Sequence, residues 1–263
     1  MTERYAVIGH PVSHSQSPAI HARFAQAVGQ KIEYGRIEAP LDGFERAVDE
    51  FRAAGGKGLN VTLPFKQAAF RYCGEVTARA GEGQVVNTLI FGERTRGDNT
   101  DGVGLVRDIE GNLGVPLGGK TVLLMGAGGA AQAVAGSLLG ARVGRLVIAN
   151  RTFEKAEALA ARFKATAARY DEIREPFDIV INGTSAGLGA EAAALPGAAI
   201  GRATLAYDMV YGRQTPFLLA ARAKGAKCAD GLGMLVEQAA ESFFLWRGVR
   251  PPTRSVLASL RGG

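Results

Sequence analysis

Residues 121–131 read Thr-Val-Leu-Leu-Met-Gly-Ala-Gly-Gly-Ala-Ala, a short apolar run followed by a glycine-rich turn and small residues. The spacing of Gly126, Gly128 and Ala131 matches the G-x-G-x-x-G/A turn that joins a buried strand to a helix in dinucleotide-binding βαβ units. Gly126 permits the tight turn, Gly128 lets the backbone approach a pyrophosphate, and Ala131 allows close helix packing. The segment therefore predicts a parallel α/β domain that binds dinucleotide phosphates at a helix N-terminus.

The residues after the next predicted strand indicate which dinucleotide binds. That strand, residues 145–149, ends at Asn150-Arg151-Thr152, and Lys155 follows one helical turn later. An NAD site normally has Asp or Glu here to accept a hydrogen bond from the ribose 2′-hydroxyl, and positions 150–152 hold no acid. Because guanidinium and ammonium groups suit a 2′-phosphate, the sequence favours NADP over NAD.

Composition limits the class of protein. The chain has 263 residues, 47% of them hydrophobic and 21% charged, which is enough for two α/β domains with substantial cores. Its net charge of +6 is spread along the chain, which favours small anionic ligands over nucleic acid. Cys73 and Cys228 match no metal-ligand spacing and indicate a reducing compartment. With no secretory signal and no long apolar run, we expect a cytoplasmic protein without a membrane span.

Short apolar strands alternate with helical segments along the chain, which predicts parallel sheets with helices on both faces. The glycine turn lies in mid-chain, so a whole domain is expected before it. The expected strands are 5–8, 32–37, 58–62, 86–91, 95–98, 121–125, 145–149, 177–182, 204–208 and 226–229, with 86–91 and 95–98 forming a hairpin-like pair. The expected helices are 17–28, 41–54, 64–72, 101–113 and 233–246.

Polar residues gather directly after the first strand, in the segment 9–18. Ser17 before Pro18 is typical of a helix N-cap, so capping by itself explains Ser17. Ser13 and Ser15 exceed what a cap needs, and they favour a polyhydroxylated or carboxylated ligand at the carboxyl ends of the strands. The three histidines of the chain lack metal-ligand spacing.

Three later segments repeat this pattern at the ends of further strands. Asn60-Val-Thr-Leu-Pro-Phe-Lys66 places a lysine beside a proline-stiffened turn, and 86–88 and 98–102 supply amides, hydroxyls and acids. The simpler explanations are a surface charge for Lys66 and a helix cap for Asp101.

Taken together and in order, these motifs resemble shikimate dehydrogenase over nearly the whole chain. The likeness rests on segments 9–18, 60–66, 86–88, 98–102, 126–130, 150–152, 182–187 and 230–238. It implies NADPH-dependent reversible reduction of 3-dehydroshikimate to shikimate, a step towards chorismate and the aromatic amino acids. Gln132 and Lys155 stand where arginine is common in the family.

The resemblance also implies an architecture. It predicts an N-terminal open α/β substrate domain and a C-terminal Rossmann-like NADP-binding domain, with a cleft between them. Residues 1–101 and about 238–263 would form the substrate-binding catalytic domain, and residues 102–237 the NADP-binding domain. The implied partners are a small-molecule substrate and NADP, with no nucleic acid and no membrane, and a homodimer is left open.

By the same resemblance, Lys66 and Asp101 form the catalytic pair. Reducing a ketone needs hydride at carbon and a proton at oxygen, and the sequence leaves open whether Lys66 transfers that proton or mainly orients the substrate. The implied substrate-binding residues are Ser15, Ser17, Thr62, Lys66, Asn87, Asp101, Tyr211 and Gln238. The implied cofactor-binding residues are Gly126, Ala127, Gly128, Gly129, Ala130, Asn150, Arg151, Thr152, Lys155, Met209 and Gly231. No metal is expected.

Three other functions are compatible with parts of the sequence. A quinate/shikimate dehydrogenase would share the lysine–aspartate pair with relaxed cofactor use, but no acid stands at 150–152. Glutamyl-tRNA reductase needs a nucleophilic cysteine, and Cys73 lies in no recognisable reactive motif. A non-catalytic shikimate or quinate sensor would not need both Lys66 and Asp101. For an enzyme, we expect closure over the substrate, with glycine-rich turns near 183–189 as mobile segments.

Overall fold

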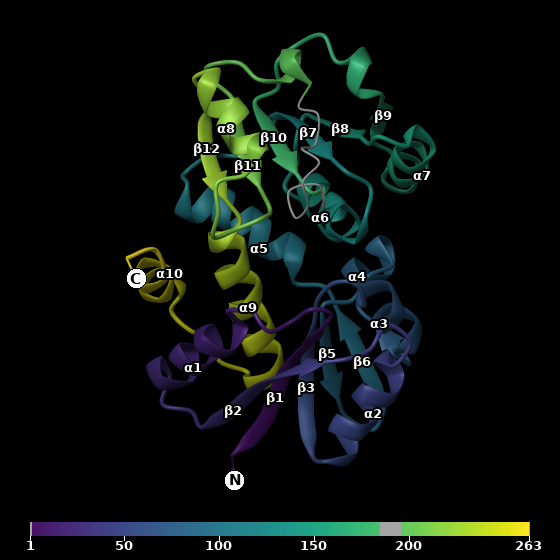
Figure 1. Ribbon diagram of the computed structural model, residues 1–263, viewed down its shortest axis with the longest axis vertical. Coiled ribbons are helices and arrows are strands. Elements are labelled where there is room, and N and C mark those ends of the chain that lie inside the picture. Colours follow the sequence, from purple (N-terminus) through teal and green to yellow (C-terminus); the bar gives the residue numbers. More distant parts are fainter. Residues whose placement is uncertain (1, 185–195, 263) are drawn as a thin grey trace. The chain divides into compact units, whose positions relative to one another are not determined.

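The computed structural model describes residues 2–184 and 196–262. By its internal contacts the chain divides into two compact units, Met1–Gly104 with Leu235–Gly263, and Leu105–Met234. Each unit has a six-stranded sheet (Figure 1). The glycine-rich turns predicted near 183–189 lie almost entirely outside the described residues.

The first unit has a mixed sheet. Its strand order is β2-β1-β3-β5-β6-β4. The elements are β1 (Glu3–Gly9), α1 (Ser17–Ala27), β2 (Ile32–Glu38), α2 (Phe44–Ala53), β3 (Gly56–Val61), α3 (Lys66–Tyr72), β4 (Glu75–Val76), α4 (Ala78–Gly83), β5 (Thr88–Phe91), β6 (Thr95–Asp98), the start of α5 (Asp101–Arg107), most of α9 (Leu232–Arg247), and α10 (Thr253–Arg261). The predicted hairpin-like pair of 86–91 and 95–98 is present as the antiparallel strands β5 and β6, and β5 also runs antiparallel to β3, so this sheet is mixed where a parallel one is expected. The short connection between β5 and β6 allows a hairpin but no parallel crossover.

Along each strand of the first sheet, successive side chains point to opposite faces. Both faces are covered by helices and carry buried side chains. On β1, Ile8 joins a buried cluster with Phe44 and Phe65, which belong to α2 and to the turn before α3. Tyr5 lies on the opposite face and stacks on Trp246 of α9, with ring centroids 4.7 Å apart. Within this unit, α1 and α9 therefore cover the face opposite to α2 and α3 (Figure 1).

The second unit has a sheet in which all strands are parallel, in the order β12-β11-β10-β7-β8-β9. Its elements are a π-helix η1 (Asp108–Asn112), β7 (Thr121–Met125), α6 (Gly129–Gly140), β8 (Arg145–Ala149), α7 (Phe153–Phe163), β9 (Thr166–Ala168), β10 (Ile179–Asn182), β11 (Leu205–Asp208), α8 (Pro216–Ala223) and β12 (Lys227–Asp230), with 3-10 turns at Tyr170–Glu172 and Gly197–Ala199. The sequence did not predict β9 or α8. β9 has only three residues and no apolar run for pattern reading to detect.

Side chains alternate between the two faces of this sheet as well. Leu123 and Met125 of β7 pack with Phe217 and Leu218 of α8 in one buried cluster. Tyr207 of β11 lies on the other face and is fully buried. The helix predicted over 101–113 is α-helical only to Arg107 and continues as η1.

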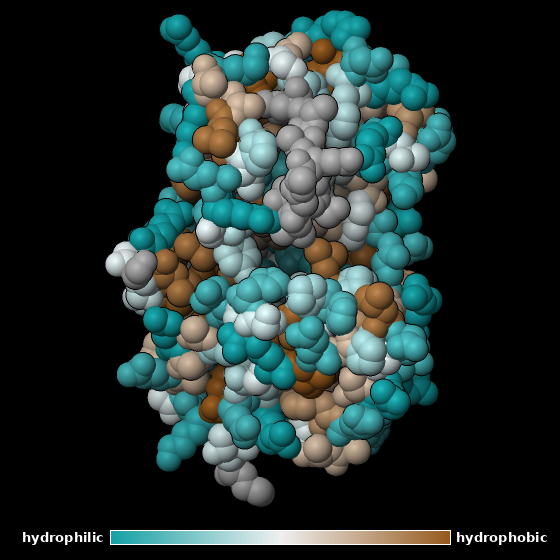
Figure 2. Space-filling model, viewed as in Figure 1, coloured by the Kyte–Doolittle hydropathy of each residue, from teal (hydrophilic) through white to brown (hydrophobic). Residues whose placement is uncertain are grey.

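The surface of the described residues shows scattered hydrophobic side chains. Figure 2 shows small brown groups among teal, hydrophilic residues. Among the described residues, the large hydrophobic side chains that are exposed are those of Leu41, Leu63, Val76 and Leu219. No helix within the described part of the chain is long and apolar enough to cross a membrane. Across residues 2–184 and 196–262, no group of three or more His, Cys, Asp or Glu side chains is placed to hold a metal ion.

Candidate functional site

Lys66 and Asp101 form a close ion pair in the first unit. Lys66 is the first residue of α3 and Asp101 the first of α5, and Lys66 Nζ lies 2.5 Å from Asp101 Oδ2. The two side chains are only 15% and 8% exposed. Water and salt screen a pair this buried much less than a surface pair, so each charge strongly orients the other.

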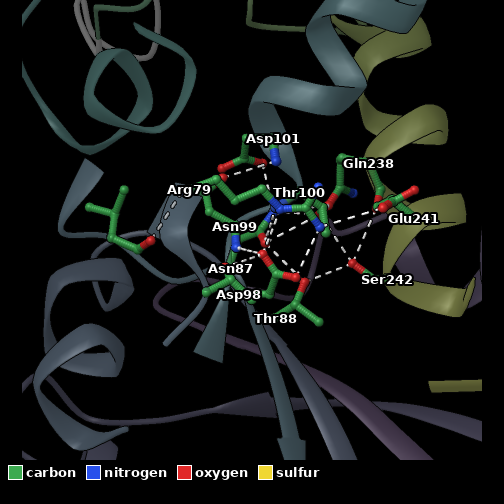
Figure 3. A network of polar contacts seen from close by, with 12 residues as sticks. Arg79, Asn87, Thr88, Asp98, Asn99, Thr100, Asp101, Gln238, Glu241 and Ser242 are labelled. Carbon is green, nitrogen blue, oxygen red and sulfur yellow. Dashed lines mark hydrogen bonds and ion pairs between the residues drawn. The ribbon is translucent and has the colours of Figure 1, made fainter. Parts of the chain in front are cut away.

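Asn87 holds the second carboxylate oxygen of this pair. Its Nδ2 donates to Asp101 Oδ1 at 2.9 Å, and Gln238 Oε1 and Thr100 Oγ1 lie 3.2 Å and 2.9 Å from the same nitrogen. Its Oδ1 accepts the Thr100 backbone N–H at 2.9 Å, which fixes the orientation of the amide. Figure 3 shows Asn87, Thr100, Asp101 and Gln238 converging from the β5 and β6 ends and from α9.

A helix cap is the simpler explanation that the sequence offers for Asp101, and the structure shows a different role. The Asp101 backbone N–H donates to Asn99 Oδ1 at 3.0 Å, so Asn99 supplies the capping interaction. Both carboxylate oxygens of Asp101 bind side chains outside the helix. The carboxylate therefore serves the polar cluster and not the helix end.

Ser15 and Ser17 lie together after β1. The Ser15 hydroxyl donates to Ser17 Oγ at 3.2 Å and accepts from the Ser17 backbone N–H at 3.3 Å. The N-cap of α1 is Gln16 without a side-chain cap bond, so the prediction that Ser17 caps this helix is wrong. Arg36 Nη2 donates to the Ser15 carbonyl at 2.7 Å and holds the segment on β2.

The turns after β1 and β3 are joined to each other. The His10 N–H donates to the Leu63 carbonyl, and the Thr62 N–H donates to the Ile8 carbonyl, at 3.0 Å and 2.9 Å. A Cβ at Gly9 would lie 2.4 Å from the Thr62 methyl group, so only glycine allows this approach. The first unit thus brings Lys66, Asn87, Asp101 and Gln238 into one network. Thr62 lies beside the segment that carries the serines.

The glycine turn of the second unit has the predicted geometry. Gly126 has φ +105°, and a Cβ there would lie 3.0 Å from the Gly183 carbonyl oxygen. Gly128 precedes α6, is exposed, and has open space where a Cβ would be, whereas Ala131 is fully buried. The first N–H groups of α6 therefore face a position that a pyrophosphate could approach.

Basic side chains follow β8. Arg151, Thr152 and Lys155 are exposed at the start of α7, and Asn150 Nδ2 donates to the Thr152 carbonyl at 2.9 Å. Burial raises the pKa of Tyr170, and the nearby Arg151 charge partly opposes that rise. This charge distribution fits the 2′-phosphate of NADP. Gln132 turns back to the Ala127 carbonyl at 3.2 Å and so supports the glycine turn.

Met209 and Gly231 meet beyond the ends of β11 and β12. A Cβ at Gly231 would lie 2.3 Å from the Met209 carbonyl oxygen, and one at Gly183 would lie 3.2 Å from Met209 Sδ. Tyr211 follows in the same loop and is partly buried. The structure therefore groups the predicted cofactor residues at one end of the second sheet, and Tyr211 belongs to this unit.

Sequence reasoning missed four residues that organise these clusters. Asp208, at the end of β11, accepts hydrogen bonds from Thr215 and from the Val210 N–H and so shapes the loop that carries Met209. In the first unit, the missed residues are Asn60, Thr100 and Ser242. Asn60 and Thr100 lie inside the motifs 60–66 and 98–102, whereas Ser242 is detectable only as the residue one helical turn after Gln238.

Taken as a class, a two-unit α/β protein with a glycine turn before a helix and a buried lysine–aspartate pair is typical of nicotinamide-dependent oxidoreductases. Comparison with models of known protein families identifies one family within this class. Residues 7–89 match the shikimate dehydrogenase substrate binding domain, residues 109–189 match shikimate / quinate 5-dehydrogenase, and residues 231–261 match the shikimate 5'-dehydrogenase C-terminal domain.

Individual proteins of known sequence or structure are similar to this chain over nearly its full length. A shikimate dehydrogenase (NADP(+)) of Methylobacillus flagellatus is 55% identical, covering 98% of this chain and 99% of its own. Among solved structures, an Ael1 enzyme from Pseudomonas putida has a TM-score of 0.94 at 50% identity, covering 98% of both chains. Shikimate 5-dehydrogenase from Thermus thermophilus, in complex with NADP(H) and shikimate, has a TM-score of 0.91 at 37% identity, covering 99% of both. The chain belongs to the shikimate dehydrogenase family, and the predicted family and two-domain α/β fold are confirmed.

Proposed function

We propose that this chain catalyses the NADPH-dependent reversible reduction of 3-dehydroshikimate to shikimate, in the pathway to chorismate and the aromatic amino acids. The observation that carries the proposal is the buried Lys66–Asp101 pair, with Nζ and Oδ2 2.5 Å apart and Oδ1 held by Asn87. The names of the full-length relatives support the substrate and the cofactor.

The chemistry assigns separate tasks to the two residues of the pair. NADPH supplies a hydride to the carbonyl carbon when it is bound. The Lys66 ammonium donates a proton to the carbonyl oxygen, and the neutral amine takes it back in the reverse direction. Asp101 keeps the ammonium oriented with Oδ2, while its Oδ1 remains bound to Asn87.

The remaining residues of the first unit suit the other groups of shikimate. The hydroxyls of Ser15 and Ser17 bind the carboxylate, and Thr62, Asn87 and Gln238 bind the ring hydroxyls with the catalytic pair. In the second unit, Tyr211 completes the substrate residues. Such a site excludes analogues that lack a hydroxyl, because its own polar groups would lose their partners.

The cofactor is held by the second unit. Its pyrophosphate binds at Gly126–Ala130 and the α6 N-terminus, its 2′-phosphate at residues 150–152 and Lys155, and its nicotinamide beside Met209 and Gly231. Residues 1–101 and about 238–263 thus act as the substrate-binding catalytic domain, and 102–237 as the NADP-binding domain. A cytoplasmic location and a homodimer stay predictions, to be checked by fractionation and light scattering.

The activity test follows nicotinamide absorbance with shikimate, quinate or neither, and with NADP⁺ or NAD⁺. The wild type is compared with Lys66→Ala and with Lys57→Ala, an exposed lysine of β3. Shikimate-dependent NADP⁺ reduction that collapses only in Lys66→Ala supports the proposal. An inactive wild type that still binds shikimate would show a sensor, and equal rates with quinate would show a quinate/shikimate dehydrogenase.

The glutamyl-tRNA reductase alternative has little chemical support. Burial raises the pKa of the Cys73 thiol to about 12, so it stays protonated at neutral pH. A thiol in that state is a poor nucleophile.

A further inference from the structure

Asp98, the last residue of β6, is a buried acid to which the proposed function gives no task. Its Oδ1 accepts hydrogen bonds from Thr77 Oγ1 at 2.7 Å and from the Asn99 backbone N–H at 2.6 Å. The guanidinium of Arg79, from α4, donates to both carboxylate oxygens of Asp98, at 2.6 Å from Nε and at 2.9 Å from Nη2. Two such contacts fix the direction of a guanidinium as well as its distance, so Arg79 is held firmly at the strand end.

The same guanidinium reaches a second carboxylate, which belongs to α9. Arg79 Nη2 lies 3.4 Å from Glu241 Oε1, and Arg250 Nη1 donates to Glu241 Oε2 at 2.7 Å. The side chains of Asp98 and Glu241 are only 2% and 8% exposed, so water and salt screen these contacts much less than those of a surface pair. Figure 3 shows Arg79 in contact with both acids. Arg79 therefore forms a charged bridge from the end of β6 to α9.

Both ends of this bridge adjoin residues of the proposed site. On the strand side, the Asp98 carbonyl accepts a hydrogen bond from the Asn87 backbone N–H at 3.0 Å. On the helix side, Glu241 follows Gln238 by three residues, so the two are neighbours on one face of α9. Gln238 Oε1 in turn accepts from Asn87 Nδ2 at 3.2 Å. The bridge thus holds α9 against the strand ends one helical turn from the contact between Gln238 and Asn87.

We propose that Arg79 is a positioning residue that holds α9 at the distance from the end of β6 at which Gln238 meets Asn87. The inference rests on the proposed function, in which Gln238 and Asn87 bind ring hydroxyls of the substrate. Arg79 acts through Glu241 and the helix and needs no contact with the substrate. Without the guanidinium, Asp98 and Glu241 are two like charges with no cation between them, and they repel. The Gln238 amide is then displaced from the ring hydroxyl that it binds.

The test is a double-mutant cycle between Arg79→Gln and Gln238→Ala, with kcat and the KM values for shikimate and NADP⁺ measured in each variant. Arg79→Gln should raise the KM for shikimate about tenfold and leave the KM for NADP⁺ within about twofold. In the Gln238→Ala background the same change should raise the shikimate KM less than about twofold, because the group that Arg79 positions is gone. Equal rises in both backgrounds, no rise, or an equal rise in both KM values would overturn the proposal.

Arg96→Gln is the matched control, because Arg96 is an exposed arginine of the same strand β6. It should leave both KM values unchanged, and the Tm of each variant shows whether it is folded. If Arg79→Gln does not fold, because Asp98 has lost its partner, Glu241→Ala replaces it. That variant removes the bridge on the helix side and leaves Arg79 bound to Asp98, and a wild-type shikimate KM in it would overturn the proposal.

The failure of this inference is distinguishable from the failure of the proposed function. A wild type without shikimate-dependent NADP⁺ reduction refutes the proposed function itself. An active wild type with an unaffected Arg79→Gln refutes only the positioning role of Arg79.

Discussion

The hydroxyl of Tyr207 donates a 2.6 Å hydrogen bond to Asp108 Oδ2, inside the second unit. Both residues are fully buried, and Asn112 Nδ2 donates to the other carboxylate oxygen at 2.9 Å. The carboxylate lies against the first turn of α9, where a Cβ on Gly233 would be 1.9 Å from Asp108 Oδ1. Because its partners hold the carboxylate, it has little room to move.

Gly233→Ala should therefore destabilise the protein by about 1–3 kcal/mol, as overpacking of a buried site does. The measurement is the free energy of unfolding in urea. Gly140→Ala is the control, because it lies at the end of α6 with open space around its Cβ position. That variant should be neutral or slightly stabilising. Equal stability of the two variants would show that the Asp108 side chain moves aside at low cost.

Asp101→Asn should lower kcat about 10²- to 10⁴-fold, with a smaller change in the KM for NADP⁺. The amide can still accept from Asn87, but the charge that orients the Lys66 ammonium is lost. Steady-state kinetics in both directions measures the effect. Asp42→Asn, an exposed acid in the same unit, should have no effect. A kcat within threefold of the wild type would remove Asp101 from the proposed catalytic pair.

Arg151→Ala should raise the KM for NADPH about 10- to 100-fold and leave the KM for NADH nearly unchanged, because only NADPH carries a 2′-phosphate. Kinetics with both cofactors measures the ratio. Arg162→Ala, at the other end of α7, is the control for a general loss of positive charge. Equal losses with both cofactors would contradict the 2′-phosphate assignment.

Acid should destabilise the protein partly through His21. Its pKa is lowered from 6.5 to about 3 by burial, so the native state keeps it neutral while the unfolded chain binds a proton below pH 6.5. The free energy of unfolding therefore falls as the pH drops from 6.5 towards 3, and at pH 4.5 this residue accounts for about 2–3 kcal/mol of the loss.

The His21 imidazole stacks on the Tyr34 ring, with centroids 4.2 Å apart, so His21→Phe removes the titrating group and keeps an aromatic ring in its place. Urea unfolding at pH 7 and pH 4.5 should show a smaller difference between the two pH values than in the wild type. His14→Gln, an exposed histidine, should retain the full difference. An unchanged difference in His21→Phe would mean that His21 is not the buried titrating group.

Local sequence patterns predicted much of the fold. The run 121–125 and the glycines after it predicted a buried strand, a tight turn and a helix, and β7 and α6 follow in that order. Such a pattern is readable because strand burial and glycine conformation depend on adjacent residues. The hairpin-like pair of β5 and β6 was predicted as well, whereas the antiparallel pairing of β5 with β3 and the three-residue β9 were not, because strand pairing depends on residues far apart in the sequence.

The sequence by itself determined the parallel α/β unit and the preference for NADP, because each depends on residues close together in the chain, and it determined the family, because the likeness rests on short motifs that occur in order along the chain. Only the tertiary structure decided that Asn87 binds Gln238, 151 residues away, and that the Tyr34 hydroxyl donates to Asn60 Oδ1. Periodicity indicates which face of a strand or helix is buried, but not which distant side chain meets it there. Those contacts are decided by how β2, α9 and the β5 and β6 ends pack in one unit, where buried polar groups must find partners.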